Sequence, residues 1–154
     1  MREWKHDDRP AMPAGPWDNE PDKVQWVDEA TGLDCLIHRG PAGALCGYVG
    51  VPPEHPLHGK DYEIPDIEVH GGLTYADACQ ENASEGHGIC HIPEPGRPAD
   101  VWWFGFDTAH CGDYCPRYDG DKSPRTRGNL TYRTIGYVKA ECASLAKQLA
   151  AVGT

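Results

Sequence analysis

The sequence predicts an α+β fold: a small, mostly antiparallel sheet with a C-terminal helix packed on one face and long Pro/Gly-rich loops. Short apolar runs bounded by turn residues recur along the chain, which is typical of short strands. Eighteen glycines and 14 prolines indicate many turns. Apolar residues recur at helical spacing only near the C-terminus. A length of 154 residues suits one ordinary domain with its own core.

The first element is an N-terminal arm, residues 1–22, which is rich in proline, charged and small side chains. We expect this arm to be extended or disordered, with at most Trp4 or Trp17 as an anchor, because few of its residues can enter a core. A single α+β domain then spans residues 23–154.

The domain begins with the signature of a β-hairpin. Val24 and Trp26 alternate with polar neighbours, and a turn-like Glu-Ala-Thr-Gly segment follows at residues 29–32. The alternation then resumes with Leu33, Cys35 and Ile37.

Three further apolar runs predict strands, at residues 44–51, 67–70 and 101–106. The last of these runs is the most apolar, so we expect it to be the central strand. Proline-containing, irregular segments separate and follow these runs, which predicts loops at residues 52–64, 76–99 and 114–130.

The last element is a helix at about residues 134–151. Its apolar residues recur every three or four positions and predict one stripe that faces the sheet. This stripe consists of Val138, Cys142, Leu145 and Leu149. Gly153 suits a C-terminal cap.

Charge and hydropathy argue against several classes of protein. The formal net charge is −10, whereas sequence-independent binding of nucleic acid needs a basic surface that releases counterions. No stretch approaches the length of a membrane span, and the N-terminus has no signal-peptide core. We therefore expect a cytoplasmic protein whose seven cysteines are reduced thiols. The sequence indicates no particular oligomeric state.

Two motifs place polar residues where an apolar run ends beside glycines. One is His-Gly-Gly-Leu-Thr-Tyr at residues 70–75, and the other is Trp-Trp-Phe-Gly-Phe-Asp-Thr-Ala-His-Cys-Gly-Asp at residues 102–113. A strand fixes the position of such a residue, and the loop frees its side chain for chemistry. If the two runs are neighbouring strands, their ends bring together His70, Asp107, His110 and Asp113.

Two kinds of chemistry fit this predicted site. Imidazole and carboxylate groups suit zinc or another divalent metal, with His70, Asp107 and His110 as ligands and a bound water as the nucleophile. Without a metal, His–Asp pairs support general acid–base catalysis, so all four residues, including Asp113, are candidate catalytic residues. A structural role, as turn caps and backbone partners, also fits these residue types.

A ligand pocket is a related prediction. Gly71 and Gly72 allow a backbone to approach a ligand closely, and Arg117 and Arg125 could neutralise a phosphate. Hydrogen bonds and stacking could come from Thr74, Tyr75 and Trp103. The combination fits a small polar, nucleotide-like ligand.

The cysteines offer an alternative, structural zinc site. Three residues separate Cys111 from Cys115, a gap that is common in such sites. Cys79, Cys90 and His91 are further candidate ligands, although Cys79 and Cys90 are not closely spaced in the sequence. Free cysteines also pack as small hydrophobic residues.

The motifs at residues 70–75 and 102–113, together with residues 47–52, 55–62 and 141–149, resemble those of a known family. It comprises small, uncharacterised proteins encoded by tailed bacteriophages and prophages. The resemblance covers roughly residues 24–150 and implies a bacterial host cytoplasm, without implying an activity.

The sequence thus predicts a phage-type accessory protein with a polar His/Asp site. We expect the site to bind a metal or a small polar ligand, and hydrolysis is an activity that such a site supports. The alternative is a non-catalytic interaction protein that binds a host protein through its acidic surface and loops.

Overall fold

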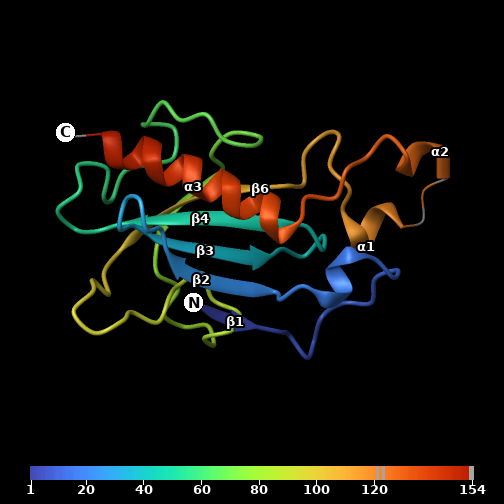
Figure 1. Cartoon of the computed structure of the whole chain (residues 1–154), viewed down its shortest axis with the longest axis horizontal. Helices are drawn as coiled ribbons and strands as arrows, with labels where there is room; N and C mark the ends of the chain where they lie inside the picture. Colours follow the sequence, from blue (N-terminus) through green and yellow to red (C-terminus); the bar gives the residue numbers. More distant parts are fainter. Residues whose placement is uncertain (121, 123, 153–154) are drawn as a thin grey trace.

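The protein folds as a six-stranded antiparallel sheet with one long helix on a face, which confirms the predicted α+β class (Figure 1). The computed structural model describes residues 1–120, 122 and 124–152. The strand order is β1-β2-β3-β4-β6-β5. The strands are β1 (Arg2–Trp4), β2 (Lys23–Val27), β3 (Asp34–Arg39), β4 (Leu45–Val51), β5 (Tyr75–Ala78) and β6 (Trp102–Asp107). The helices are the 3-10 turn η1 (Pro16–Asn19), α1 (Pro116–Asp119), α2 (Pro124–Arg127) and α3 (Ile135–Ala151).

Strands β2, β3 and β4 form the meander that the hairpin signature predicts. Val24 on β2 pairs with Ile37 on β3, and both side chains are fully buried on the same face. The turn between β2 and β3 is closed by Asp28, whose carboxylate accepts hydrogen bonds from the amide and hydroxyl of Thr31.

Several sequence predictions for the rest of the chain need correction. The predicted loop at residues 76–99 begins inside strand β5, which ends at Ala78. The run at residues 101–106 forms β6, but this strand lies second from one edge, because β5 pairs beyond it. The predicted loop at residues 114–130 contains the short helices α1 and α2.

Helix α3 buries the apolar stripe that its sequence predicts. The stripe packs on β3 and β4, and Figure 1 shows the helix running obliquely alongside β4. The hydroxyl of Thr134 accepts a hydrogen bond from the Tyr137 amide and caps the first turn. The predicted cap at Gly153 lies outside the described residues. The fully buried positions of the stripe are Val138, Cys142, Leu145 and Leu149.

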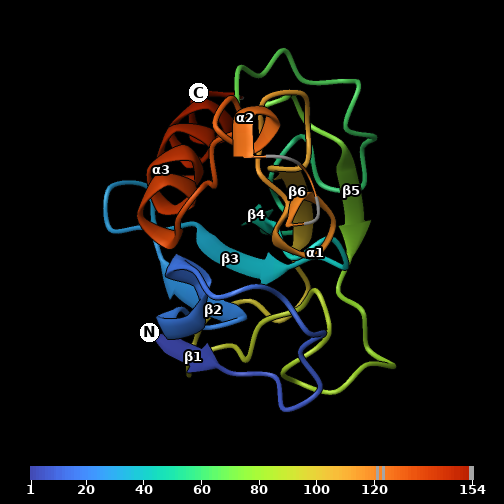
Figure 2. The same cartoon turned by 90° about the vertical axis from the view of Figure 1, so that its right-hand side faces the viewer.

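The opposite face of the sheet is covered by the long loop between β5 and β6. Cys79 and Ile89 from this loop pack on a second buried cluster. Figure 2 shows α3 and this yellow-green loop on different sides of β2 and β3. Both faces of the sheet are therefore shielded from solvent. The second cluster consists of Leu36, Tyr48, Val101 and Trp103.

Residues 67–70 are not a strand, contrary to the sequence prediction. The segment runs beside α3, where the side-chain amide of Gln148 bonds both the amide and the carbonyl of Glu68. The carboxylate of Glu141 accepts a hydrogen bond from the His70 amide at 2.8 Å. Helix side chains thus satisfy backbone groups that a neighbouring strand would otherwise satisfy.

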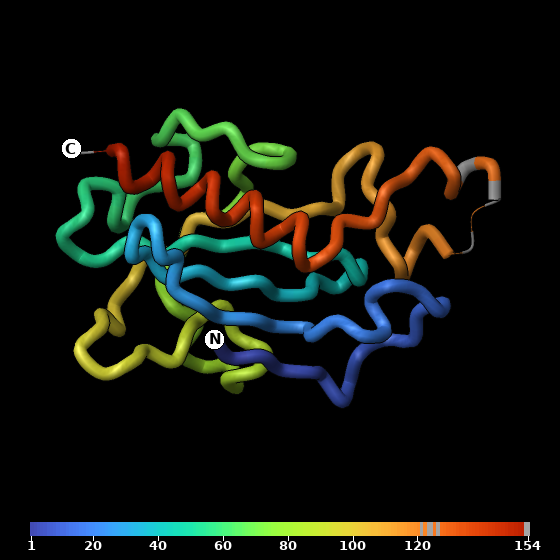
Figure 3. The backbone as a smooth tube through the Cα atoms, in the orientation of Figure 1, coloured from blue at the N-terminus to red at the C-terminus, as the bar shows by residue number. Residues whose placement is uncertain are grey.

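The N-terminal arm is packed against the domain, and it is not disordered. Strand β1 pairs with β2, and Figure 3 shows the blue segment following the edge of the sheet before it returns to β2. The Trp17 side chain is buried, with its ring stacked on Tyr114 and edge-on to Tyr132. Composition left open whether the arm is extended or disordered, because it does not show what an edge strand and one buried tryptophan, Trp17, can contact. No described helix combines the length and the hydropathy that crossing a bilayer requires.

Candidate functional site

The centre of the candidate site is a chain of hydrogen bonds through His70. Its Nε2 lies 2.8 Å from the Asp113 Oδ2, and its Nδ1 lies 2.7 Å from the Tyr137 hydroxyl. The three side chains come from the segment beside α3, from the loop after β6 and from the first turn of α3. Residues far apart in the sequence therefore converge at the N-terminal end of α3.

Asp113 supplies the negative charge in this chain of hydrogen bonds, and its side chain is 1% exposed. Burial opposes its ionisation, but hydrogen bonds from Arg133, His70 and the His110 amide outweigh burial and lower the pKa of Asp113. An ionised carboxylate only accepts hydrogen bonds, so the Nε2 of His70 carries the proton between them. In the neutral imidazole, Nδ1 then accepts the hydrogen bond of the Tyr137 hydroxyl.

A second His–Asp pair lies beside the first. The Nε2 of His110 is 3.1 Å from the Asp107 Oδ1, and the rings of His70 and His110 have centroids 6.3 Å apart. The contact with Asp107 lacks hydrogen-bond geometry, so this buried nitrogen has no hydrogen bond within the described part of the chain. Asp107 instead accepts hydrogen bonds from the Thr74 hydroxyl and the Ala109 amide. The structure thus brings together all four polar residues that the motifs singled out.

The glycines of the first motif position this second pair. Gly71 has φ +68°, and a Cβ atom there would lie 2.2 Å from the Cδ2 of His110. Only glycine allows the backbone and the imidazole to approach so closely. Gly72 also has a positive φ, +79°, but a Cβ atom there would meet nothing within 4 Å. Gly71 is therefore needed for both the turn and the packing, whereas Gly72 is needed for the turn alone.

Several predicted ligand-binding residues lie elsewhere. Trp103 is fully buried in the cluster on the face opposite α3, and Tyr75 packs edge-on against Tyr48 in the same cluster. Arg117 donates to the Pro41 carbonyl beside the β3–β4 turn, and Arg125 is exposed on α2. Of the predicted polar and aromatic ligand contacts, only the Thr74 hydroxyl joins the His/Asp site through a described hydrogen bond.

The sequence prediction missed three residues of the site. Arg133 donates through Nε to the Asp113 Oδ1 at 2.8 Å, and its guanidinium lies 4.9 Å from the centroid of the Tyr137 ring. Glu141 holds the His70 amide. Arg133 lies just before the helix cap Thr134, whereas Tyr137 and Glu141 lie four residues apart on one face of α3. That spacing is the signal that could have identified Tyr137 and Glu141.

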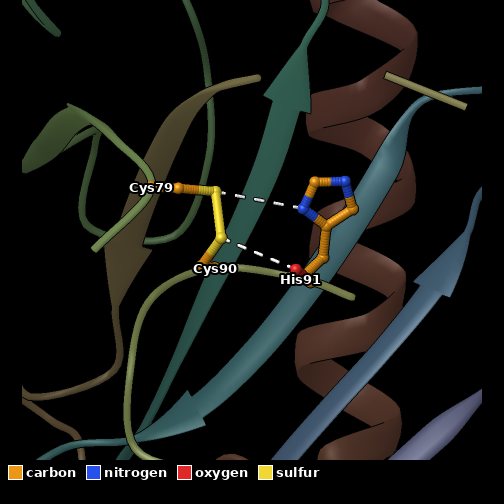
Figure 4. Close-up of side chains that lie close together, drawn as sticks. All are labelled: Cys79, Cys90 and His91. Atoms are coloured by element: carbon orange, nitrogen blue, oxygen red, sulfur yellow. Dashed lines mark hydrogen bonds between the residues drawn. A yellow bond between two sulfur atoms is a disulfide. The ribbon is translucent and has the colours of Figure 1, made fainter. Parts of the chain in front are cut away.

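The predicted cysteine site has a different outcome. Cys79 and Cys90 form a disulfide next to His91, which corrects the expectation that all cysteines are reduced (Figure 4). These sulfurs are joined to each other, so they offer no thiolate to zinc in this state. Cys111 is exposed, whereas Cys115 is buried, and burial together with nearby Asp119 raises the pKa of its thiol to about 11. A raised pKa disfavours the thiolate that a zinc ligand requires.

Metal ligation at His70 does not fit the observed contacts. Both ring nitrogens of His70 are engaged by protein groups, which leaves no lone pair directed at an ion. Two other groups in the described chain each place three potential ligand atoms within 4.8 Å of one another. One is Cys79, Cys90 and His91, and the other is His6, Asp8 and His87.

Comparison with protein-family models, with curated proteins and with solved structures gives no match to this chain. The geometry of the site is therefore the basis for a functional proposal.

Proposed function

We propose that this chain is a phage-type accessory protein whose His/Asp site binds a small polar ligand and exchanges a proton with it. The observation that supports the proposal is the hydrogen-bonded chain from Asp113 through His70 to the Tyr137 hydroxyl. A carboxylate that orients an imidazole, which in turn contacts a hydroxyl, is the arrangement that activates hydroxyl groups in acyl transfer and hydrolysis. The phage setting depends on the sequence resemblance alone.

The proton path follows from the positions of these groups. When Tyr137 loses its proton to the Nδ1 of His70, the positive imidazolium is stabilised by the ionised Asp113 at Nε2. The guanidinium of Arg133 lies 4.9 Å from the centroid of the Tyr137 ring, so a positive charge stands beside the oxygen that gives up its proton. The Tyr137 oxygen can then accept a proton from a bound ligand or from a water that attacks it.

A small polar ligand fits these contacts better than a metal does. The imidazole of His70 is already saturated by protein groups, whereas the buried Nε2 of His110 has no hydrogen bond within the described chain. The guanidinium of Arg133 lies beside the hydrogen-bonded residues Asp113, His70 and Tyr137. Because a guanidinium binds anionic groups, we propose an anionic or nucleotide-like ligand.

Binding is tested by adding adenosine monophosphate or inorganic phosphate to the labelled protein and recording its amide NMR spectra. We expect adenosine monophosphate to shift the amides of residues 70–74, 110–113 and 133–137, and we expect Tyr137→Phe to weaken this effect. The matched control is Tyr118→Phe, because Tyr118 is 59% exposed on α1. Shifts confined to other regions, or an unchanged response in Tyr137→Phe, would contradict ligand binding at this site.

Proton transfer is tested by hydrolysis of p-nitrophenyl acetate and p-nitrophenyl phosphate. Loss of a positioned acid–base group typically lowers the rate by about 100-fold or more, so Tyr137→Phe should remove most turnover and Tyr118→Phe should not. If neither ester is hydrolysed and neither binding probe shifts the site, the proposal is wrong. The non-catalytic interaction protein is then the remaining interpretation.

A further inference from the structure

A second cluster of histidine and carboxylate groups lies away from α3, where the N-terminal arm meets the loop between β5 and β6. The rings of His6 and His87 stack with centroids 4.2 Å apart, and the His87 Nε2 lies 3.0 Å from the Asp8 Oδ1. One ligand atom from each of these three residues lies within 4.8 Å of the others. We propose that His6, Asp8 and His87 bind a zinc ion that fastens the arm to the loop.

The second nitrogen of each ring is already held by the protein. The Nε2 of His6 contacts the Gly86 carbonyl, and the Nδ1 of His87 lies 2.9 Å from the Ser84 hydroxyl. Metal-binding histidines usually have their other nitrogen fixed in this way by a carbonyl, carboxylate or similar group. An ion would therefore bind the His6 Nδ1 and the His87 Nε2, and it would replace the present hydrogen bond between the His87 Nε2 and the carboxylate of Asp8, which becomes a ligand itself.

The distances suit zinc after small movements of exposed side chains. Two ligands at ordinary zinc bond lengths in a tetrahedral site are separated by about 3.3 Å. The 3.0 Å contact between Asp8 and His87 is close to that separation. These two side chains are 74% and 47% exposed, so they can rotate to admit an ion. Two imidazoles and one carboxylate also form a typical donor set for zinc.

The surroundings leave room for a fourth ligand. The three residues line a cavity of about 280 Å³, together with His38 on β3. The buried Nε2 of His38 has no hydrogen bond within the described chain, and its ring centroid is 5.5 Å from that of His6. A water bound to zinc would give this nitrogen a partner.

The positive charges near the cavity do not prevent cation binding. Arg9, Arg39 and Arg117 also line it. The first two guanidiniums are paired with the buried carboxylate of Asp22, and Arg117 donates to the Pro41 carbonyl. The loop that carries His87 is held in place independently, because the Lys23 ammonium donates to the Glu85 and Gly88 carbonyls. The ligands are thus presented by segments that are ordered before the metal binds.

The test measures zinc binding to the full chain by calorimetry and by metal analysis, without reductant so that the disulfide persists. We expect one zinc per chain, and we expect His6→Gln and His87→Gln each to lower the affinity by at least tenfold. His58→Gln is the matched control, because His58 faces Asp100 in another His–Asp contact at 3.7 Å. His70→Asn should also keep the zinc, which separates this proposal from the function proposed for the His70 site.

Cobalt gives a readout that does not depend on the variants. Wild-type protein loaded with Co²⁺ should show the visible bands of a four-coordinate ion, without a thiolate-to-cobalt charge-transfer band. A thiolate band would place the metal at the cysteines and overturn the proposal. It would also be overturned by the absence of zinc binding at micromolar concentrations, or by unchanged binding in both His6→Gln and His87→Gln.

Discussion

The carboxylate of Asp22 connects the N-terminal arm to the sheet, and its neutralisation is the sharpest test of how the arm is held. Asp22 accepts hydrogen bonds from the His6 amide at 2.8 Å, from the Nε of Arg9 at 2.9 Å and from the Nε of Arg39 at 2.7 Å. The Asp22 side chain is 1% exposed, and that of Arg39 is 4% exposed. Asp22→Asn therefore removes the negative charge that two partly or fully buried guanidiniums share.

The expected loss of stability follows from that burial. Removing one partner of a buried ion pair costs about 3–5 kcal/mol, because the remaining charge stays desolvated and unpaired. The matched control is Asp7→Asn on the same arm, because Asp7 is exposed. An exposed substitution of this kind usually changes the free energy of unfolding by less than about 0.5 kcal/mol.

The assay is urea unfolding at several pH values. Burial opposes the ionisation of Asp22, but hydrogen bonds from the His6 amide, Arg9 and Arg39 outweigh it and lower its pKa below the ordinary 3.8. The ionised carboxylate therefore stabilises the fold above pH 3.8, and this contribution is lost as the pH falls through the lower pKa of the folded state. The gap between wild type and Asp22→Asn should be constant above about pH 5 and should narrow below pH 3.8. A gap under about 1 kcal/mol at pH 7 would refute the reasoning, because it is well below the expected loss for a buried pair.

Three further predictions concern stability. Leu145→Ala should lower the free energy of unfolding by about 2–5 kcal/mol, because it leaves a cavity under α3. The control Lys147→Ala, at an exposed position, should change it little, and equal melting temperatures for wild type and Leu145→Ala would show that α3 is not docked. Deleting residues 1–20 should cost at least about 3 kcal/mol, the usual loss for a buried tryptophan, and an unchanged melting temperature would show that the arm does not pack. Reducing the Cys79–Cys90 disulfide, which joins cysteines 11 positions apart, should cost about 3 kcal/mol by the chain-entropy relation, and identical urea midpoints with and without dithiothreitol would contradict this.

Local sequence patterns were sufficient to predict the helix and strands whose contacts are close in sequence or follow a regular spacing. The helical spacing of Val138, Cys142, Leu145 and Leu149 was sufficient to predict α3 and its buried face. Alternation likewise predicted β2 and β3, because Val24, Cys35 and Ile37 on one face of these strands join the apolar core cluster under α3.

The candidate site was found for a partly incorrect reason. The sequence prediction assumed that residues 67–70 form a strand, whereas Glu141 and Gln148 of α3 hold this segment by its backbone. His70 reaches Asp113 because of that contact with the helix. A single sequence does not show which side chains will satisfy an extended backbone, so Tyr137 and Arg133 were missed.

The arm and the disulfide depend on contacts between distant segments. Composition predicted an extended or disordered arm at residues 1–22, with Trp17 as one candidate anchor, but the packing of Trp17 against Tyr132 depends on where the chain returns. The spacing of Cys79 and Cys90 resembles no compact cysteine motif. Their pairing follows from a loop that folds back over the second face of the sheet.

The measurement that tests the central claim most directly is the protonation of the His70 ring in solution. Long-range proton–nitrogen NMR spectra of the labelled protein identify which ring nitrogen carries hydrogen, and the His70→Asn variant assigns the signal. In the neutral ring we expect hydrogen on Nε2, and we expect Tyr137→Phe to shift the Nδ1 resonance. The averaged signals of a freely exchanging tautomer pair, or hydrogen on Nδ1 alone, would contradict the chain from Asp113 through His70 to Tyr137.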